Sequence, residues 1–268
     1  MLSIAMMAAG LLALSGPAAA IQFGQPDGNA HPYVCLGVVY DEDDAPLWRT
    51  TGELIAPGVV LTAGHGTYGT AGARVWFWSE IPPSSPDGYP FGGPGSYHGT
   101  PYTNPEYRVV PLPGLPGFDY HDVGIVLLDE PVVADRYGVL PEAGVVGGFR
   151  PRQPVDLVGY GVNYREPGGG FDPYDQWRWN RARYFAPTQL VENRGRLSSE
   201  FMKLAANPAQ GDGGGTFGDS GGPALLAGTD TILSITSFGT NTPCMGVGYY
   251  QRIDLPDILA WIEGFIPD

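Results

Sequence analysis

The sequence predicts an all-β protein with one C-terminal helix. Among 268 residues there are 41 glycines and 27 prolines, and charged residues make up only 16% of the chain. Short segments rich in valine, tyrosine and phenylalanine lie between these turn-forming residues, a pattern typical of short strands joined by turns. No sequence repeat is evident, but two barrel-like halves are compatible with the length and with the spacing of the segments.

Strand-like segments follow one another along most of the chain. The first half holds those at 33–40, 51–55, 59–63, 74–78 and 123–128, and the second half those at 154–161, 188–191, 201–205, 224–226, 232–238 and 247–253. Residues 79–108 and 163–183 are rich in turn formers, and we expect them to be long exposed loops. Near the C-terminus, Asp254 is placed to cap a helix and Pro256 suits its first turn. The apolar face of this helix consists of Ile258, Leu259, Trp261, Ile262 and Phe265.

Residues 1–20 have the pattern of a secretory signal peptide. Residues 4–14 form an apolar core too short to span a bilayer, and Ala18–Ala20 give the small-residue cleavage pattern, although no lysine or arginine precedes the core. We therefore expect a secreted, extracellular protein whose mature chain has two halves, 21–135 and 136–268. No later segment reaches the length of a membrane-spanning helix, so we expect no membrane partner after removal of the signal.

The net charge of −14 limits the partners of the chain, because such a surface repels nucleic acid and anionic lipid. The acidic run Asp41–Asp44 lacks the spaced ligands and the glycine of a calcium loop, which favours a solvated hairpin tip. The sequence contains no phosphate loop, zinc-ligand spacing or nucleotide fingerprint. We expect a monomer that needs no metal and no cofactor.

Ser220 lies in the segment Gly218-Asp219-Ser220-Gly221-Gly222-Pro223, which follows a glycine run at 211–215. Glycines on both sides permit a tight turn that exposes the serine hydroxyl and points successive backbone N–H groups at one place. Acyl transfer requires this combination of a nucleophile and an oxyanion site. The pattern Gly-x-Ser-x-Gly alone is equally compatible with a plain turn between two strands, so other residues must decide.

Two further side chains stand at the ends of predicted core strands. His65 follows the strand at 59–63 within a turn of small residues, which can hold an imidazole rigidly. Asp122 precedes the apolar run 123–128, where an unpaired carboxylate would be costly. A single histidine is more often structural than catalytic, and His121, beside Asp122, is a competing candidate for a catalytic base.

Three motifs combine these residues: Thr62-Ala63-Gly64-His65-Gly66, Asp122-Val123-Gly124-Ile125 and the segment from Gly218 to Pro223. In this order they resemble the chymotrypsin-like (trypsin-like) serine protease family, as a secreted, bacterial-type member. Segments 21–24, 237–239 and 248–253 also match, so the resemblance covers nearly all of residues 21–268. An α/β-hydrolase is excluded, because its serine precedes its histidine and no histidine follows Ser220.

The resemblance implies two six-stranded antiparallel Greek-key β-barrels and a C-terminal helix, with His65 and Asp122 on the first barrel and Ser220 on the second. It implies a serine endopeptidase that acts on protein or peptide through an acyl-enzyme intermediate. Ser220 would be the nucleophile, His65 the general base and Asp122 the group that orients the imidazole. The backbone N–H groups of Gly218 and Ser220 would bind the oxyanion, and Ser237 would donate to Asp122.

The same resemblance assigns a specificity pocket. Gly214 matches its base and Gly239 and Gly248 match its walls; the complete predicted substrate-binding set is Gly214, Phe217, Ser237, Phe238, Gly239 and Gly248. An open, uncharged pocket predicts a large apolar or aromatic residue before the scissile bond. Asp212 is the alternative residue that would bring a charge into the pocket.

Asp219 matches the buried aspartate that, in the family, pairs with the terminal ammonium of the mature chain. Ile21 would supply that terminus. Because Ala20–Ile21 is also the predicted signal cleavage site, we expect signal peptidase itself to create the activating terminus.

The cysteines depart from the family pattern. One family disulfide would join the positions of Thr50 and Gly66, and a second would join the position of Thr216 to Cys244. Cys35, in the other half of the chain, is not a matching partner for Cys244. Losing such cross-links costs a few kcal/mol of stability, so a catalytically weak, protease-like binding protein is an alternative function. An esterase that uses the same site is another.

Overall fold

The computed structural model describes residues 21–82, 88–112, 115–162, 181–193, 199–241 and 244–267. The predicted signal peptide at 1–20 and most of the predicted loop at 163–183 lie outside the described residues. Within the described ranges, no helix has the length and the apolar character needed to cross a membrane.

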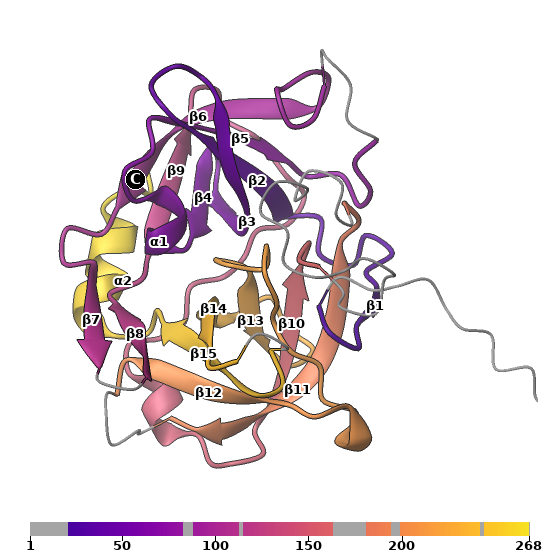
Figure 1. The fold of residues 1–268 in the computed structure, drawn as a ribbon, viewed down its shortest axis with the longest axis vertical. Coiled ribbons are helices and arrows are strands. Elements are labelled where there is room, and N and C mark those ends of the chain that lie inside the picture. Colours follow the sequence, from indigo (N-terminus) through magenta and orange to yellow (C-terminus); the bar gives the residue numbers. More distant parts are fainter. Residues whose placement is uncertain are drawn as a thin grey trace, which may run out of the picture.

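Six antiparallel strands close the first barrel, in the upper half of Figure 1. Around the barrel they are β2 (Val34–Tyr40), β3 (Pro46–Ala56), β4 (Val59–Thr62), β9 (Gly124–Leu128), β6 (Ser96–Thr103) and β5 (Gly72–Trp76), and β5 pairs back with β2. Every residue of β2 and β4 is buried, as expected from their continuous apolar sequence.

The second barrel repeats this arrangement, in the lower half of Figure 1. Its ring consists of β10 (Pro154–Gly159), β11 (Tyr184–Glu192), β12 (Phe201–Ala206), β15 (Gly246–Arg252), β14 (Ile232–Gly239) and β13 (Pro223–Leu226), and β13 pairs back with β10. When the strands of each barrel are numbered along the chain, both rings have the Greek-key order 1-2-3-6-5-4. The prediction of two six-stranded antiparallel Greek-key barrels is confirmed, and the repeat exists in topology without a sequence repeat.

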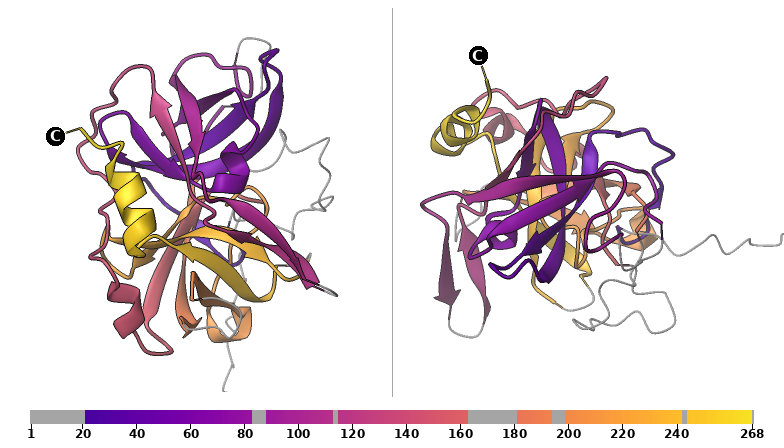
Figure 2. Two further views of the ribbon diagram at one scale, coloured as in Figure 1. Left: turned by 90° about the vertical axis from the view of Figure 1, so that its left-hand side faces the viewer. Right: turned by 90° about the horizontal axis from the view of Figure 1, so that it is seen from above.

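The first and last described segments of the chain cross over between the barrels. Strand β1 (Gln25–Pro26) pairs with β11, and Ile21 is buried in the core of the second barrel. The structure thus places residues 21–26 on the second barrel, outside the half to which the sequence assigned them. At the other end, α2 (Pro256–Glu263) packs Ile258 and Ile262 into the core that contains the first barrel. Figure 2 shows this helix beside the first barrel.

Two sequence predictions need correction. The segment 79–108 is not one long loop, because β6 lies within it. Only Gly99 of β6 is buried, so the strand is held by its backbone ladders to β5 and β9 and carries no apolar signal.

Asp254 does not cap α2, whose N-cap is Leu255. The Asp254 carboxylate instead pairs with Arg252 and accepts a hydrogen bond from the Val146 backbone at 2.9 Å.

A hairpin outside the barrels extends from the first barrel to the second. It consists of β7 (Arg108–Leu112) and β8 (Leu115–Tyr120) and precedes β9. The ring of Phe118 on β8 lies 5.0 Å from the ring of Phe238 on β14, edge to face, and Phe238 stacks on Tyr249 at 4.7 Å. These aromatic contacts fix the hairpin against the second barrel.

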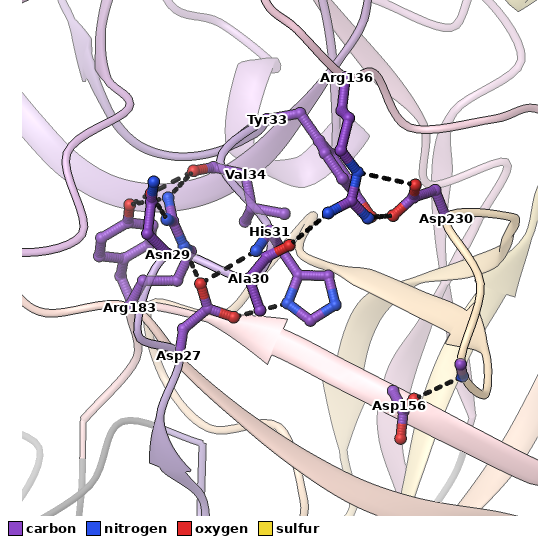
Figure 3. A network of polar contacts seen from close by, with 12 residues as sticks. Asp27, Asn29, Ala30, His31, Tyr33, Val34, Arg136, Asp156, Arg183 and Asp230 are labelled. Carbon is purple, nitrogen blue, oxygen red and sulfur yellow. Dashed lines mark hydrogen bonds and ion pairs between the residues drawn. The ribbon is translucent and has the colours of Figure 1, made fainter.

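The segment after Ile21 is anchored by a buried ion pair between Asp27 and Arg183 (Figure 3). The Arg183 guanidinium donates to Asp27 at 2.8 Å, to the Val34 carbonyl at 2.8 Å and to the Tyr160 hydroxyl at 3.1 Å. Burial acts to raise the pKa of Asp27, but hydrogen bonds from His31 and Arg183 outweigh it and lower that pKa to about 2. The ion pair therefore stays charged, and it holds together segments from both halves of the chain.

The remaining described helices are α1 (Gly64–Thr67) and the short 3-10 helices η1 (Val145–Gly148) and η3 (Pro208–Gln210).

Candidate active site

Asp122 is completely buried, and both barrels donate hydrogen bonds to its carboxylate. One oxygen accepts from the His65 backbone N–H at 2.7 Å, and the other lies 2.8 Å from Nδ1 of the His65 ring. This second oxygen also accepts from the hydroxyl of Ser237 on β14. The backbone N–H of Asp122 donates to the Gln251 side chain on β15 at 3.1 Å. The structure thus brings together His65, Asp122 and Ser237, which the sequence had proposed as partners.

His65 lies in α1, directly after β4, and its ring is half-buried. Because a carboxylate can only accept, Asp122 fixes the proton on Nδ1 and leaves Nε2 free to take a second proton. Burial acts to lower the pKa of His65, but the charge and the hydrogen bond of Asp122, with the charge of Asp119, raise it to about 8. The ring can therefore act as a base whose conjugate acid is stabilised by the site.

Ser220 sits in a turn that only glycines permit. Gly218 and Gly221 have φ angles of +93° and +80°, and a Cβ atom on Gly221 would lie 2.2 Å from the Thr62 hydroxyl oxygen. The Ser220 carbonyl accepts from the Thr51 backbone N–H at 2.9 Å and from the Thr50 hydroxyl. The nucleophile turn of the second barrel is therefore held by β3 of the first.

The backbone N–H groups of Gly218 and Ser220 are available for a ligand. Neither donates to a carbonyl or side chain in the part of the chain that the structure describes, whereas the neighbouring Asp219 N–H donates to Thr216 at 3.0 Å. Two free N–H groups in one glycine-containing turn are what an oxyanion site requires.

A pocket of roughly 270 Å³ opens beside His65 and Ser220. Five predicted substrate-binding residues line it: Phe217, Ser237, Phe238, Gly239 and Gly248. Gly214 is not in the lining; its backbone pairs with Gln22, and the next residue, Gly215, borders the pocket instead. Asp212 is also outside it, because both of its oxygens accept from the Gln189 side chain at 3.0 Å. The ionisable residues in the described lining of the pocket are His65, Asp119, Cys244, Tyr249 and Tyr250.

Asp219 is buried next to Ile21. A Cβ atom on Gly159 would lie 2.1 Å from an Asp219 oxygen and 3.3 Å from Cδ1 of Ile21, so the two side chains flank the same glycine. Burial raises the pKa of Asp219 to about 6, although hydrogen bonds from Thr216 and Gly161 and the charge of Arg49 act in the opposite direction. Asp219 is thus a buried acid beside Ile21, and both of its oxygens accept hydrogen bonds.

Thr50 and Thr216, which match cysteine positions of the resembling family, form hydrogen bonds to other segments. The Thr50 hydroxyl lies 3.3 Å from the place of a Cβ on Gly66, and it donates to Ser220. The Thr216 hydroxyl donates to the Val162 carbonyl at 2.6 Å, and its backbone N–H donates to Asp219 at 2.8 Å. Neither cysteine forms a disulfide: Cys35 is buried, and Cys244 is half-buried in the lining of the pocket.

The structure separates His121 from the site and adds Asp119 to it. The His121 ring faces Asp257 at 3.1 Å and Glu200 at 3.5 Å and does not line the pocket, so it is not the base beside Ser220. Sequence reasoning missed Asp119, which lies on the hairpin strand β8. The signal that could have identified it is an acidic residue only three positions before Asp122.

The possible metal-ligand atoms of His65, Asp119 and Asp122 lie within 4.8 Å of one another, which is close enough to bind one metal ion. However, Nδ1 of His65 and an oxygen of Asp122 already share a hydrogen bond at 2.8 Å. A cation bound to all three side chains would have to replace that hydrogen bond.

Comparison with family models and with curated proteins finds no match. Among solved structures, the chain is similar to HL collagenase, with a TM-score of 0.65 and 15% identity over 87% of this chain and 93% of that one. It is similar to human heparin binding protein, with a TM-score of 0.59 and 16% identity over 90% and 94%. It is also similar to the scabies mite inactivated protease paralogue S-I1, with a TM-score of 0.59 and 18% identity over 90% and 97%. The chain therefore has the chymotrypsin-like serine protease fold.

The titration of His65 is a first test of this site. We expect the ring to lose its proton near pH 8, and Asp119→Asn to move the midpoint to lower pH, because a negative charge that favours the protonated ring is removed. NMR of ¹⁵N-histidine-labelled protein measures this, and His65→Ala assigns the signal among the four histidines. Asp43→Asn, on the exposed acidic turn, is the control and should leave the midpoint unchanged. An unchanged midpoint in Asp119→Asn would show that Asp119 does not act on the ring.

The geometry at Thr50 also predicts an engineered disulfide. A Cβ atom on Gly66 would lie 3.7 Å from Cβ of Thr50, close to the mean Cβ–Cβ separation across a disulfide. The double variant Thr50→Cys, Gly66→Cys should therefore oxidise and gain about 3 kcal/mol in the free energy of unfolding. Mass spectrometry and urea unfolding measure this, with Thr50→Ser, Gly66→Ser as the matched control. A pair of thiols that stays free under oxidising conditions would contradict the closeness of β3 and α1 in the structure.

Proposed function

We propose that this protein is a secreted serine endopeptidase that acts as a monomer on protein or peptide substrates. The observation that carries the proposal is the pair of His65 and the buried Asp122 in the same pocket as Ser220. A buried carboxylate that orients an imidazole beside a serine hydroxyl is the arrangement that activates serine as a nucleophile. Secretion rests on the pattern of residues 1–20.

In the proposed reaction, the Ser220 hydroxyl oxygen attacks the scissile carbonyl carbon while Nε2 of His65 takes the hydroxyl proton. The carbonyl oxygen becomes an oxyanion bound by the N–H groups of Gly218 and Ser220, each worth about 3 kcal/mol to the transition state. His65 then gives its proton to the departing amine, leaving an acyl group on Ser220. A water molecule, deprotonated by His65, hydrolyses this ester and restores the serine. Asp122 holds the imidazole and stabilises its cation throughout.

The pocket supports a preference for a large apolar or aromatic residue before the scissile bond. Gly239 and Gly248 add no side chains to its lining, and Phe217 and Phe238 provide apolar surface. The end of β14, at Ser237 to Gly239, extends beyond its pairing with β13 and pairs with β15, so its other edge offers backbone groups with which an extended substrate can pair.

Covalent labelling tests the proposal directly. A phenylalanine-type organophosphonate should label wild-type protein at Ser220, and Ser220→Ala should abolish both the labelling and the cleavage of matched peptides. Peptides with Phe or Tyr before the scissile bond should be cleaved faster than those with Arg. An unlabelled Ser220 in correctly processed protein would instead support a binding function; one of the similar structures is a heparin binding protein, and another is an inactivated protease paralogue. Cleavage of esters without cleavage of peptides would support an esterase.

We also propose that removal of residues 1–20 activates the enzyme by giving Ile21 a free ammonium group that pairs with Asp219. The support is that Ile21 and the Asp219 carboxylate are both buried and flank the same glycine, Gly159. Terminal sequencing of the secreted protein should give Ile21 as the first residue, and protein that retains additional residues before Ile21 should be labelled much more slowly. Asp219→Asn should slow labelling in the same way. A mature chain that begins several residues from Ile21 would refute this route.

A further inference from the structure

Asp119 is an acidic side chain that the proposed mechanism does not use. It lies on β8, half-buried, and borders the pocket on the same side as His65. A carboxylate oxygen of Asp119 lies within 4.8 Å of a ring nitrogen of His65 and of a carboxylate oxygen of Asp122. The carboxylate is therefore within reach of a substrate bound over His65, without belonging to the pair that activates Ser220.

Within the described chain, the Asp119 carboxylate has no cationic partner other than the imidazole. Its one hydrogen bond comes from the Tyr107 hydroxyl at 3.0 Å. Arg108, on the neighbouring strand β7, is opposite Tyr120 and lies over that ring at 5.5 Å, so it occupies the other face of the hairpin. Burial and the charge of Asp122 raise the pKa of Asp119, as expected for a half-buried acid without a close counter-ion.

The surroundings of Asp119 suit a cation with an apolar stem. The ring of Tyr107 lies 5.3 Å from the ring of Tyr68, which is exposed, so aromatic surface adjoins the carboxylate. Lysine and arginine side chains pack their methylene groups on such surface and place the charge against an acid.

Strand geometry selects the substrate position. A substrate that pairs with the backbone of Ser237 to Gly239 is extended, and adjacent side chains of an extended peptide point in opposite directions. If one side chain enters the glycine-walled end of the pocket, the preceding one points towards His65 and Asp119. We propose that Asp119 binds a lysine or arginine side chain at the substrate residue immediately before the one that fills the specificity pocket. This inference rests on the proposed function for its choice of substrate.

Binding without catalysis tests the proposal separately from the proposed function. The protein is the Ser220→Ala variant of the mature chain, without the signal peptide. The probes are fluorescent peptides that carry Phe at the residue that fills the specificity pocket. The preceding residue is Arg in one peptide and citrulline in the other, which has nearly the same shape without the charge. Anisotropy should show that the Arg peptide binds on the order of tenfold more tightly, which is typical of a hydrogen bond to a charged group.

Two further variants, each combined with Ser220→Ala, assign the preference to one side chain. Asp119→Asn should bring the two affinities to within about twofold, whereas Asp43→Asn, a matched change on the exposed acidic turn, should keep the preference. Equal affinities for the two peptides, a preference that survives Asp119→Asn, or no binding of either peptide would each overturn the inference. A preference for Arg in protein whose Ser220 cannot be labelled would refute the proposed function and leave this site standing.

Discussion

The buried carboxylate of Asp122 is the constraint on which the arrangement of the two barrels depends. An unpaired charge at such a position would cost several kcal/mol, and removing one partner of a buried pair typically costs 3–5 kcal/mol. The donors come from both sides of the interface, because His65 belongs to the first barrel and Ser237 to the second. A shift of one barrel relative to the other would remove the hydrogen bond from Ser237 to the buried charge. The geometry of the site and the docking of the barrels are therefore stabilised by the same hydrogen bonds.

The nucleophile turn depends on this interface as well. The carbonyls of Ser220 and Gly218 accept hydrogen bonds from Thr50 and Thr51 on β3, and Gly221 fits against Thr62 at the end of β4. Ser220 belongs to the second barrel, yet the first barrel holds it. Such polar contacts do at the interface what cross-links do within a loop, because they fix the positions of two segments far apart in the sequence. Each is individually worth about 1 kcal/mol, so the turn relies on several of them together.

Site residues that stand in short local motifs could be predicted from the sequence. Site residues that are brought together by packing between distant segments could not. Ser220, His65 and Asp122 stand in short motifs whose turns and strands determine their surroundings, and continuous apolar runs identified strands such as β4 and β9. The strand β6 escaped prediction because backbone ladders hold it without an apolar pattern. Asp119 escaped because its role depends on a hairpin that reaches across to the second barrel, through ring contacts such as that of Phe118 with Phe238. The position of Gly214 outside the pocket likewise follows from its pairing with Gln22, nearly 200 residues earlier.

Three carboxylates surround the candidate site, and their different partners separate their roles. Asp122 is paired with His65, Asp219 is held by backbone N–H groups, and Asp119 faces the pocket with only a tyrosine donor. The negative charge of Asp119 favours a proton on His65, so a proton on His65 and a cation at Asp119 compete for the same charge. Linkage makes this competition reciprocal. On the proposal that a basic substrate side chain binds Asp119, its arrival lowers the pKa of His65 and thereby favours the neutral ring, which is the form that can accept the proton of Ser220. The substrate that fits the site would then also prepare its base.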